Sequence, residues 1–356
     1  MILSSFYYKT IGWELDGLDA LRLTNLLVGK NASGKTRTIK AIQNVTSFLS
    51  MHATLFGNND FKTKLSFSKP DEPDWKMDYF FSVDNGNVTM ERLTVCGKDV
   101  IKRDTQKTTL DGNIIDPPVR NLVVQVRRDR VAYPEMELLM EWAEGVVTIS
   151  CSDINPFTIL SGPAKFINPI PFSYLVSSLS KEEKRNVIKS AKCLGYDIVD
   201  MIPVKTNSEL KLVAVKERYL QTELLDFQLS SGMMRVLYIL CFLEYVKHKE
   251  GVNSLILIDD LGEGLDYNRA TLLGKKVFET CEEFGLQLIA SSNDSFLMDV
   301  TDTSKWQIIR RKHSKVSAIN QTNTPELFRQ FRMTGLSNFD LFSSDFIDNF
   351  LTPSTK

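Results

Sequence analysis

The stretch that decides the fold is GKNASGKT, residues 29–36, which fits the phosphate-loop pattern G-x-x-x-x-G-K-[ST] at every fixed position. It reads, in order, Gly29, Lys30, Asn31, Ala32, Ser33, Gly34, Lys35 and Thr36. The apolar run 26–28 before it is typical of a strand, and the apolar spacing of 39–49 after it is typical of a helix. In a strand–loop–helix unit of this kind, backbone N–H groups surround phosphate oxygens, Lys35 reaches the β and γ phosphates, and Thr36 can bind Mg²⁺. We therefore predict that the chain binds a nucleoside triphosphate.

The chain on both sides of this loop is rich in strand signals. Short apolar runs separated by turn residues continue to about residue 130, and Asp84-Asn85-Gly86 is typical of a hairpin turn. Strands are expected at residues 6–10, 13–15, 21–28, 77–83, 88–95 and 122–126. Helices are then expected at residues 135–142 and 181–194, followed by strands at 198–204 and 210–215.

The second half of the chain alternates buried helices and strands. Residues 229–246 are apolar nearly all round, as in a buried helix, and residues 255–258 are a continuous apolar run, as in a central parallel strand. A helix at 270–284 and a second buried strand at 286–290 follow. This alternation predicts an α/β protein whose parallel sheet is covered on both faces, and residues from about 320 predict a short helical tail.

Two carboxylates, Asp259 and Asp260, follow the apolar run 255–258 directly. A carboxylate at the carboxyl end of a buried strand can hold Mg²⁺ beside a phosphate loop, so we expect Asp259 and Thr36 to form the metal site. Asp260 would then stand where a general base can accept a proton from the attacking water.

A third motif, Leu229-Ser230-Ser231-Gly232, comes immediately before the buried helix. Serine and glycine at this point cap a helix N-terminus, whose free N–H groups can face an anion. On these residues alone an ordinary helix cap is the favoured interpretation. The position of the motif shortly before the acidic strand favours a role in the phosphate site.

Taken together, these motifs and Gly264-Leu265-Asp266 resemble the ABC-type ATPase head, and more narrowly the SMC/RecF/OLD-like ATPases of bacteria. The resemblance implies ATP and Mg²⁺ as cofactors, and two heads joined as a homodimer, or a higher homo-oligomer, around ATP. In such a dimer Ser230, Ser231 and Gly232 would contact the nucleotide of the other subunit. By the same resemblance Asp266 belongs to the loop that couples the two sites, and Arg235 occupies the basic position often found after the third motif.

The resemblance also implies an ABC-ATPase-like head with a mixed or parallel central sheet, an antiparallel β subdomain and a helical lobe. Residues 1–130 would hold the phosphate loop and the antiparallel β part, and residues 131–204 an inserted helical lobe. Residues 205–320 would form the second half of the ATPase core, and residues 321–356 a C-terminal docking tail.

The chain departs from the family pattern at two positions. The second acid is Asp260 where the family usually has glutamate, one methylene longer, so we expect slow hydrolysis or a contribution from Glu263. After the strand at 286–290, Asn293 stands where the family often has histidine, and its amide can hydrogen-bond a phosphate or a water but cannot take a proton. Both changes favour a slow switch over a fast motor. The family's glutamine loop cannot be assigned, since neither Gln106 nor Gln125 has a convincing context.

Composition limits the other possibilities. The 356 residues are 43% hydrophobic, and 43 lysines and arginines balance 44 aspartates and glutamates, so the whole chain is not an electrostatic nucleic-acid binder. Its 5 cysteines form no C-x-x-C pair and its 3 histidines are scattered, which argues against zinc, disulfides and a catalytic triad. Reduced thiols, together with the lack of a signal peptide or a membrane-length apolar run, predict a cytoplasmic protein without membrane contact.

Three functions are compatible with these motifs. The first is a slow ATP-hydrolysing switch that controls a separately encoded effector, such as a nuclease, in bacterial anti-phage defence; the defence role rests on the family resemblance. The second is a DNA repair ATPase of RecF type, which requires basic residues facing DNA. The third is a scaffold that binds ATP for assembly with negligible turnover. The candidate DNA contacts are Arg120, Arg127, Arg128 and Arg130, and Lys305, Arg310, Arg311, Lys312 and Lys315.

Overall fold

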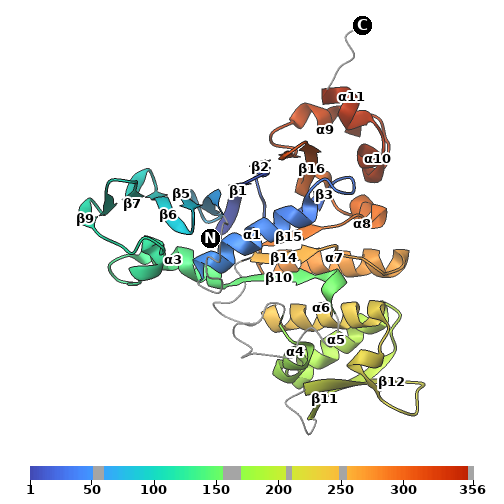
Figure 1. Ribbon diagram of the computed structural model, residues 1–356. Coiled ribbons are helices and arrows are strands. Elements are labelled where there is room, and N and C mark those ends of the chain that lie inside the picture. The colour runs from blue at the N-terminus through green and yellow to red at the C-terminus, as the bar shows by residue number, and fades with distance from the viewer. Residues whose placement is uncertain (51–59, 155–169, 206–210, 248–254, 352–356) are drawn as a thin grey trace.

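A large mixed sheet organises the computed structural model, which describes residues 1–50, 60–154, 170–205, 211–247 and 255–351. Over these ranges the sheet has 14 strands in the order β10-β14-β15-β3-β16-β17-β2-β1-β4-β5-β6-β7-β8-β9. One end of this order is parallel and forms the core, and the other is an antiparallel arm (Figure 1). The predicted α/β architecture is therefore confirmed.

The core strands run parallel to one another in a series that includes the strand before the phosphate loop. They are β3 (Thr24–Val28), β10 (Val146–Ser150), β14 (Leu255–Asp259), β15 (Leu288–Ser291) and β16 (Trp306–Lys312). All residues of β14 are buried, and they alternate between two apolar clusters. Leu255 and Leu257 share a cluster with α1 (Lys35–Leu49) and α3 (Pro134–Glu144), whereas Ile256 and Ile258 share one with α6 (Ser231–Lys247) and α7 (Tyr267–Glu283). Helices thus cover both faces of the core sheet, as the apolar runs predicted.

The antiparallel arm begins at the N-terminus and continues through consecutive hairpins. It contains β1 (Ile2–Thr10), β2 (Trp13–Leu18), β4 (Phe61–Lys69), β5 (Glu72–Asp84), β6 (Asn87–Val95), β7 (Lys98–Arg103), β8 (Thr108–Leu110) and β9 (Asn113–Ile115). The predicted turn between β5 and β6 has φ of 49° at Asn85 and 73° at Gly86. Positive φ at both central positions defines the tight hairpin turn that these two residues favour.

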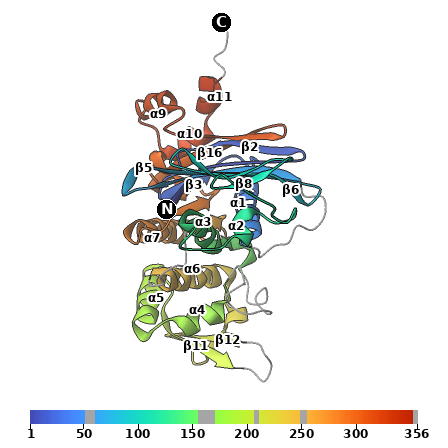
Figure 2. The same ribbon diagram turned by 90° about the vertical axis from the view of Figure 1, so that its left-hand side faces the viewer.

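A separate helical lobe lies below the core in Figures 1 and 2, with α6 (Ser231–Lys247) between them. The lobe contains α4 (Phe172–Ser178), α5 (Lys181–Cys193) and a small sheet of β11 (Ile198–Lys205), β12 (Lys211–Glu217) and β13 (Leu224–Leu225). Residues 236–243 of α6 are all buried, which is why that helix is apolar nearly all round.

The C-terminal part returns to the core before it ends in helices. After α7 (Tyr267–Glu283) and α8 (Ser295–Val300), β16 and β17 (Lys315–Ile319) form a hairpin between β3 and β2. The tail then consists of α9 (Pro325–Arg332), α10 (Asn338–Ser343) and α11 (Phe346–Leu351), at the top of Figure 1. These helices confirm the predicted helical tail.

The prediction of a strand at residues 122–126 is wrong. These residues form a short helix, α2 (Val123–Val126), because the buried carboxylate of Glu91 accepts hydrogen bonds from the backbone nitrogens of Val123, at 2.7 Å, and Val124, at 3.4 Å. A carboxylate at this point satisfies N–H groups that a helix start leaves free. Strands β10, β13, β16 and β17 were not predicted, and β4, β7, β8 and β9 fall in the segment that was predicted only in general terms to be rich in strands.

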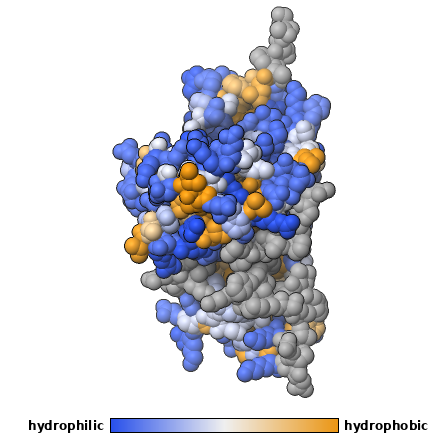
Figure 3. Space-filling view, turned by 60° about the vertical axis from the view of Figure 1, so that its left-hand side comes forward, coloured by the Kyte–Doolittle hydropathy of each residue, from blue (hydrophilic) through white to orange (hydrophobic). Residues whose placement is uncertain are grey.

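On the face in Figure 3, hydrophobic side chains occur in small groups among hydrophilic ones. Among the described residues, none of the helices has the length and apolar character needed to cross a bilayer.

Candidate nucleotide-binding site

The phosphate loop joins β3 to α1 in a conformation that its glycines make possible. A Cβ at Gly29 would lie 2.5 Å from Ser33 Oγ and 2.7 Å from the carbonyl oxygen of Ile309, so only glycine fits there. Gly34, directly before α1, has a φ of 110°, which a side chain would strain. The loop thus has the strand–turn–helix geometry that the pattern predicted.

Lys35 is held inside this loop. Its Nζ donates to the carbonyl oxygens of Gly29 at 2.7 Å and Lys30 at 3.4 Å. Burial lowers the pKa of Lys35, while the carboxylates of Asp260 and Asp259 act in the opposite direction. An anion bound in the loop would offset that desolvation, as a phosphate-binding lysine requires.

The hydroxyl of Ser33 provides an independent test of whether the loop suits a bound phosphate. Its Oγ is buried, and within the described part of the chain it has no hydrogen-bond partner. A buried polar atom without a partner is costly and in native proteins is usually satisfied by a ligand or water. A phosphate oxygen in the loop would satisfy it, so the residues present fit a bound triphosphate.

Three elements meet at the carboxylate of Asp259, which is buried at the end of β14. Its Oδ1 accepts hydrogen bonds from Thr36 Oγ1, at 3.2 Å, and from Ser291 Oγ, at 2.6 Å. Within the described residues no group of three or more histidines, cysteines or carboxylates could hold a metal on its own. One hydroxyl and one carboxylate beside a triphosphate nevertheless suit Mg²⁺, which keeps several waters and phosphate oxygens among its ligands. Ser291 was missed by sequence reasoning.

A second corner contains the predicted catalytic residues. Asp260, Glu263 and Asn293 line one cavity of about 270 Å³, together with residues 261–265 and 292–294. The backbone nitrogen of Asp260 donates to Ser291 Oγ at 2.9 Å, which links the two corners. Burial, and then the negative charges of Asp259 and Glu263, raise the pKa of Asp260, against an opposing effect of Lys35.

Asp260 also has an unusual backbone, with a φ of 55°. Aspartate and asparagine adopt this region more readily than longer side chains, because their short polar group can hydrogen-bond locally. This gives a physical reason for aspartate at a position where the ATPase family that the sequence motifs resemble usually has glutamate. Asp294 lines the same cavity and was not predicted; only its position beside Asn293 could have indicated it.

The third motif lies at the N-terminus of α6 and lines neither the cavity of Asp260 nor the cavity that borders the phosphate loop. Ser230 Oγ accepts a hydrogen bond from the backbone nitrogen of Met233 at 3.3 Å, so it caps the helix, and Ser230 and Ser231 are exposed. A Cβ at Gly232 would lie 3.3 Å from Leu265 and 3.4 Å from the carbonyl of Gly264. The motif therefore contacts the loop that follows the acidic strand.

Arg235 and Asp266 fix the elements around that loop. Arg235 Nη1 donates to the carbonyl oxygen of Glu263 and its Nε to that of Cys151, both at 2.7 Å. Asp266 caps α7, accepting from the backbone nitrogen of Arg269 at 3.1 Å and pairing with its guanidinium at 2.9 Å. Both residues thus hold the backbone next to Asp260 and Glu263.

Gln125, one of the two glutamines considered for the glutamine loop, contacts the C-terminal end of α1. Its Nε2 donates to the carbonyl oxygens of Phe48, at 2.7 Å, and Leu49, at 3.3 Å, at the C-terminal end of α1. In this conformation it satisfies carbonyls that the end of the helix leaves free.

Many of the basic residues considered for DNA are engaged in ion pairs. Arg128 pairs with Glu137 at 2.6 Å and with Glu144 at 2.8 Å, and Arg130 pairs with Glu141 at 2.8 Å. Three further pairs are Lys305–Glu282, Arg310–Asp348 and Lys315–Asp16. These carboxylates reduce the positive charge that either cluster offers to DNA phosphates.

Comparison with known proteins is informative only at the level of structure. No family model matches the sequence, and no curated protein matches it. An SMC head domain with an extended coiled coil, bound to the C-terminal domain of ScpA and derived from Pyrococcus furiosus, is similar, at 11% identity and a TM-score of 0.55 over 93% of this chain and 99% of that one. An SMC head bound to the C-winged helix domain of ScpA has 12% identity and a TM-score of 0.54, over 90% and 98% of the two chains.

The recombination mediator RecF is also similar, at 13% identity over 89% of this chain and 98% of that one, but its TM-score of 0.43 is too low to support an inference. The chain therefore has the fold of SMC head domains, an ABC-type ATPase fold. This confirms the fold implied by the sequence motifs. At such low identity the likeness concerns the fold, and the activity has to be argued from the site.

Proposed function

We propose that this chain binds ATP with Mg²⁺ at the phosphate loop and hydrolyses it slowly. The observation that carries the proposal is the convergence of Thr36, Asp259 and Ser291 beside the loop that holds Lys35. A partnerless Ser33 hydroxyl in the same loop supports an anionic ligand.

Each residue has a distinct role in this proposal. Backbone N–H groups of the loop and Lys35 bind the phosphates, and Thr36 and Asp259 would hold Mg²⁺, which when bound neutralises phosphate charge. Water attacks the γ phosphorus, ADP leaves, and Asp260 accepts the water's proton. The raised pKa of Asp260 suits a base that must hold that proton, and Asn293, which lines the same cavity, can orient the water.

We further propose that two copies close around ATP. Ser230, Ser231 and Gly232 would then complete the site of the partner subunit, and Asp266 would lie between the two sites. The exposure of both serines, outside either cavity of their own chain, is compatible with a contact in trans. Arg235 would transmit closure to the loop of Asp260 through its bond to Glu263.

The biological role follows from resemblance rather than from the site. A slow switch that dimerises on ATP is suited to restraining or releasing a separately encoded effector, for which anti-phage defence with a nuclease is the setting we propose. The similar SMC heads are bound to domains of ScpA, so a partner protein on the head is a reasonable expectation. DNA repair remains the alternative, and the ion pairs in both basic clusters weigh against it.

Calorimetry with ATP and Mg²⁺ tests the core of the proposal. The wild type and Lys40→Ala, which removes an exposed lysine of the same helix, should bind ATP. Lys35→Ala should not, because the main positive charge facing the phosphates is gone. Equal ATP binding by Lys35→Ala and the wild type would refute the site.

A further inference from the structure

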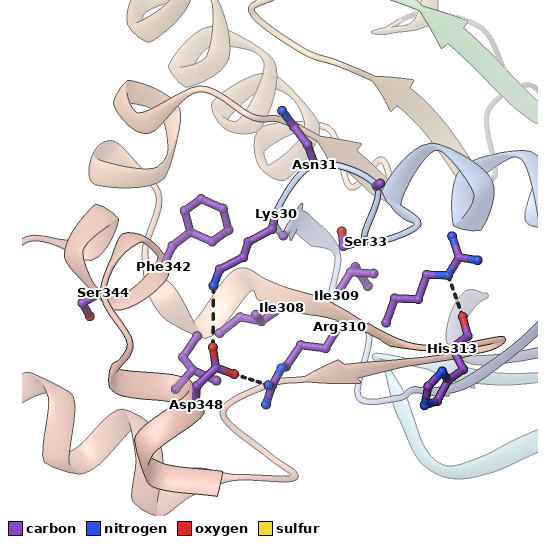
Figure 4. A pocket seen from close by; sticks show the side chains of 14 residues that line it. Lys30, Asn31, Ser33, Ile308, Ile309, Arg310, His313, Phe342, Ser344 and Asp348 are labelled. Carbon is purple, nitrogen blue, oxygen red and sulfur yellow. Dashed lines mark hydrogen bonds and ion pairs between the residues drawn. The ribbon is translucent and has the colours of Figure 1, made fainter. Parts of the chain in front are cut away.

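The phosphate loop has an outer face that the C-terminal tail, α9–α11, covers. A cavity of about 470 Å³ lies between them, bounded by residues 29–33, by residues 308–311 of β16 and His313 just after it, and by the tail (Figure 4). From the tail, the lining residues are Phe342, Ser344, Ile347 and Asp348. The loop predicted to bind phosphates therefore faces α11 across this cavity.

An ion cluster joins the two sides of this cavity. Figure 4 shows the side chains of Lys30 and Arg310 both directed at the carboxylate of Asp348. Lys30 Nζ lies 3.6 Å from Asp348 Oδ2, and Arg310 donates to Asp348 Oδ1. The carbonyl oxygen of Lys30 in turn accepts from Lys35 Nζ at 3.4 Å. One residue thus separates Asp348 from the ammonium group that would bind the phosphates.

The tail also contacts the other side of the site. Asn338 Nδ2 donates to the carbonyl oxygens of Met298, at 3.5 Å, and Thr301, at 3.1 Å, and the backbone nitrogen of Phe339 donates to Asp299 at 2.8 Å. These partners lie in or just after α8, whose N-cap is Asp294, a wall of the Asp260 cavity. The tail therefore connects the phosphate loop with the segment that carries Asn293.

Apolar packing holds the tail in this position. Leu341 and Ile347 are buried, and the rings of Phe331 and Phe346 pack edge to face with centroids 5.4 Å apart. The ion cluster is more exposed, since 67% of the Lys30 side chain and 45% of that of Asp348 are accessible. Exposed ion pairs contribute little to stability, so this one can break without unfolding α9 or α10.

We propose that α11 is an autoinhibitory latch on the phosphate loop, fastened by Asp348 to Lys30 and Arg310 and released when the loop takes up the anionic phosphates of a nucleotide. This inference rests on the proposed function. Phosphates next to Lys35 bring negative charge close to Asp348 and compete with it for Lys30, so the docked tail and the bound nucleotide oppose each other. By linkage, the factor by which docking weakens nucleotide binding equals the factor by which nucleotide weakens docking.

The experiment compares nucleotide affinity in four full-length variants by calorimetry at low salt. Asp348→Asn removes the latch charge, and Asp345→Asn removes the same charge from an exposed position just before α11, as a matched control. Lys30→Met and the double variant Lys30→Met/Asp348→Asn complete a double-mutant cycle. Asp348→Asn should bind ATP about two- to fivefold tighter than Asp345→Asn, the range set by exposed ion pairs. The Asp348 effect should be smaller in the Lys30→Met background, where the pair with Arg310 is kept, and it should shrink at high salt.

Hydrogen exchange of residues 346–351 provides the reciprocal measurement. Saturating ATP should speed exchange there in the wild type and change it little in Asp348→Asn. Equal affinities of Asp348→Asn and Asp345→Asn, or slower exchange of α11 with ATP, would overturn the latch while leaving ATP binding intact. Failure of the wild type to bind ATP would overturn both the latch and the proposed function.

Discussion

Ser291 Oγ donates to Asp259 Oδ1 at 2.6 Å and accepts from the backbone nitrogen of Asp260 at 2.9 Å, so one hydroxyl on β15 orients both acids that end β14. The two strands are parallel neighbours, which places their carboxyl ends side by side. Ser291 therefore connects the proposed metal site at Asp259 with the cavity of Asp260.

Loss of this hydroxyl should weaken magnesium use. In Ser291→Ala the carboxylate of Asp259 loses a buried partner, and outer-shell partners of metal ligands typically contribute about 10- to 100-fold in affinity or activity. We expect the half-saturating Mg²⁺ concentration for ATP hydrolysis to rise by about tenfold. Ser292→Ala is the matched control, because Ser292 Oγ donates to the carbonyl oxygen of Leu261 instead, at 2.9 Å. A Mg²⁺ requirement that rises equally in both variants would contradict the assigned role.

Asp260 and Glu263 compete for the role of base, and phosphate release separates them. If Asp260 takes the proton, Asp260→Asn should lower turnover by about 10²- to 10⁴-fold while ATP binding persists, because asparagine keeps the size but cannot accept a proton. Glu263→Gln removes the neighbouring carboxylate from the same cavity and should retain most activity. A wild-type rate in Asp260→Asn would show that Asp260 is not the base. A wild-type rate that already lies at the detection limit would favour the assembly scaffold.

The candidate site could be predicted from sequence where its chemistry is local. The phosphate loop, Asp259 and Asp260 are each recognisable within a few residues of a buried strand, and the structure brings them together. Ser291 acquires its role from a partner far along the chain, so no spacing rule reveals it. The position of Arg235 after the third motif was recognised, but its bond to the carbonyl of Glu263 was not.

The same distinction between local sequence and long-range contacts explains why the strand predicted at residues 122–126 is wrong. Residues 122–126 have the apolar character of a strand, but the buried carboxylate of Glu91 captures two of their backbone nitrogens and starts α2 instead. Tertiary contact overrides local propensity here. The contact of Asp348 with Lys30 likewise joins the tail to the phosphate loop, and neither segment's own sequence indicates this contact.

Glu91 should make stability depend on pH. Burial outweighs its hydrogen bonds from Val123, Tyr79 and Val124 and raises its pKa to about 7 from an ordinary 4.5. The folded state therefore holds this proton more tightly than the unfolded state, so the stabilisation is complete below pH 4.5 and is lost as pH rises toward 7. Glu91→Gln, which cannot titrate, serves as the reference. Urea unfolding at several pH values should show the wild type losing up to about 3 kcal/mol relative to Glu91→Gln over this range. A pH-independent difference between the two proteins would contradict the raised pKa.

Ser230→Arg tests the contact between subunits. Ser230 is exposed and caps α6 through one bond at 3.3 Å, so its replacement should cost the fold about 1 kcal/mol or less. If the motif closes over the partner's phosphates, a bulky arginine at this point should block closure while each monomer still binds ATP. Thr222→Arg places the same side chain at another exposed position, before β13, and should leave closure intact.

Light scattering with a slowly hydrolysed ATP analogue measures the outcome. We expect the wild type and Thr222→Arg to double in mass with the analogue, and Ser230→Arg to remain monomeric. Calorimetry on the same samples should give equal ATP affinity for all three monomers, measured at concentrations too low for dimers. If Ser230→Arg dimerises as the wild type does, the serine does not face the partner. If the wild type stays monomeric at saturating analogue, the ATP-closed dimer itself is wrong, and hydrolysis would have to be completed by residues of a single chain.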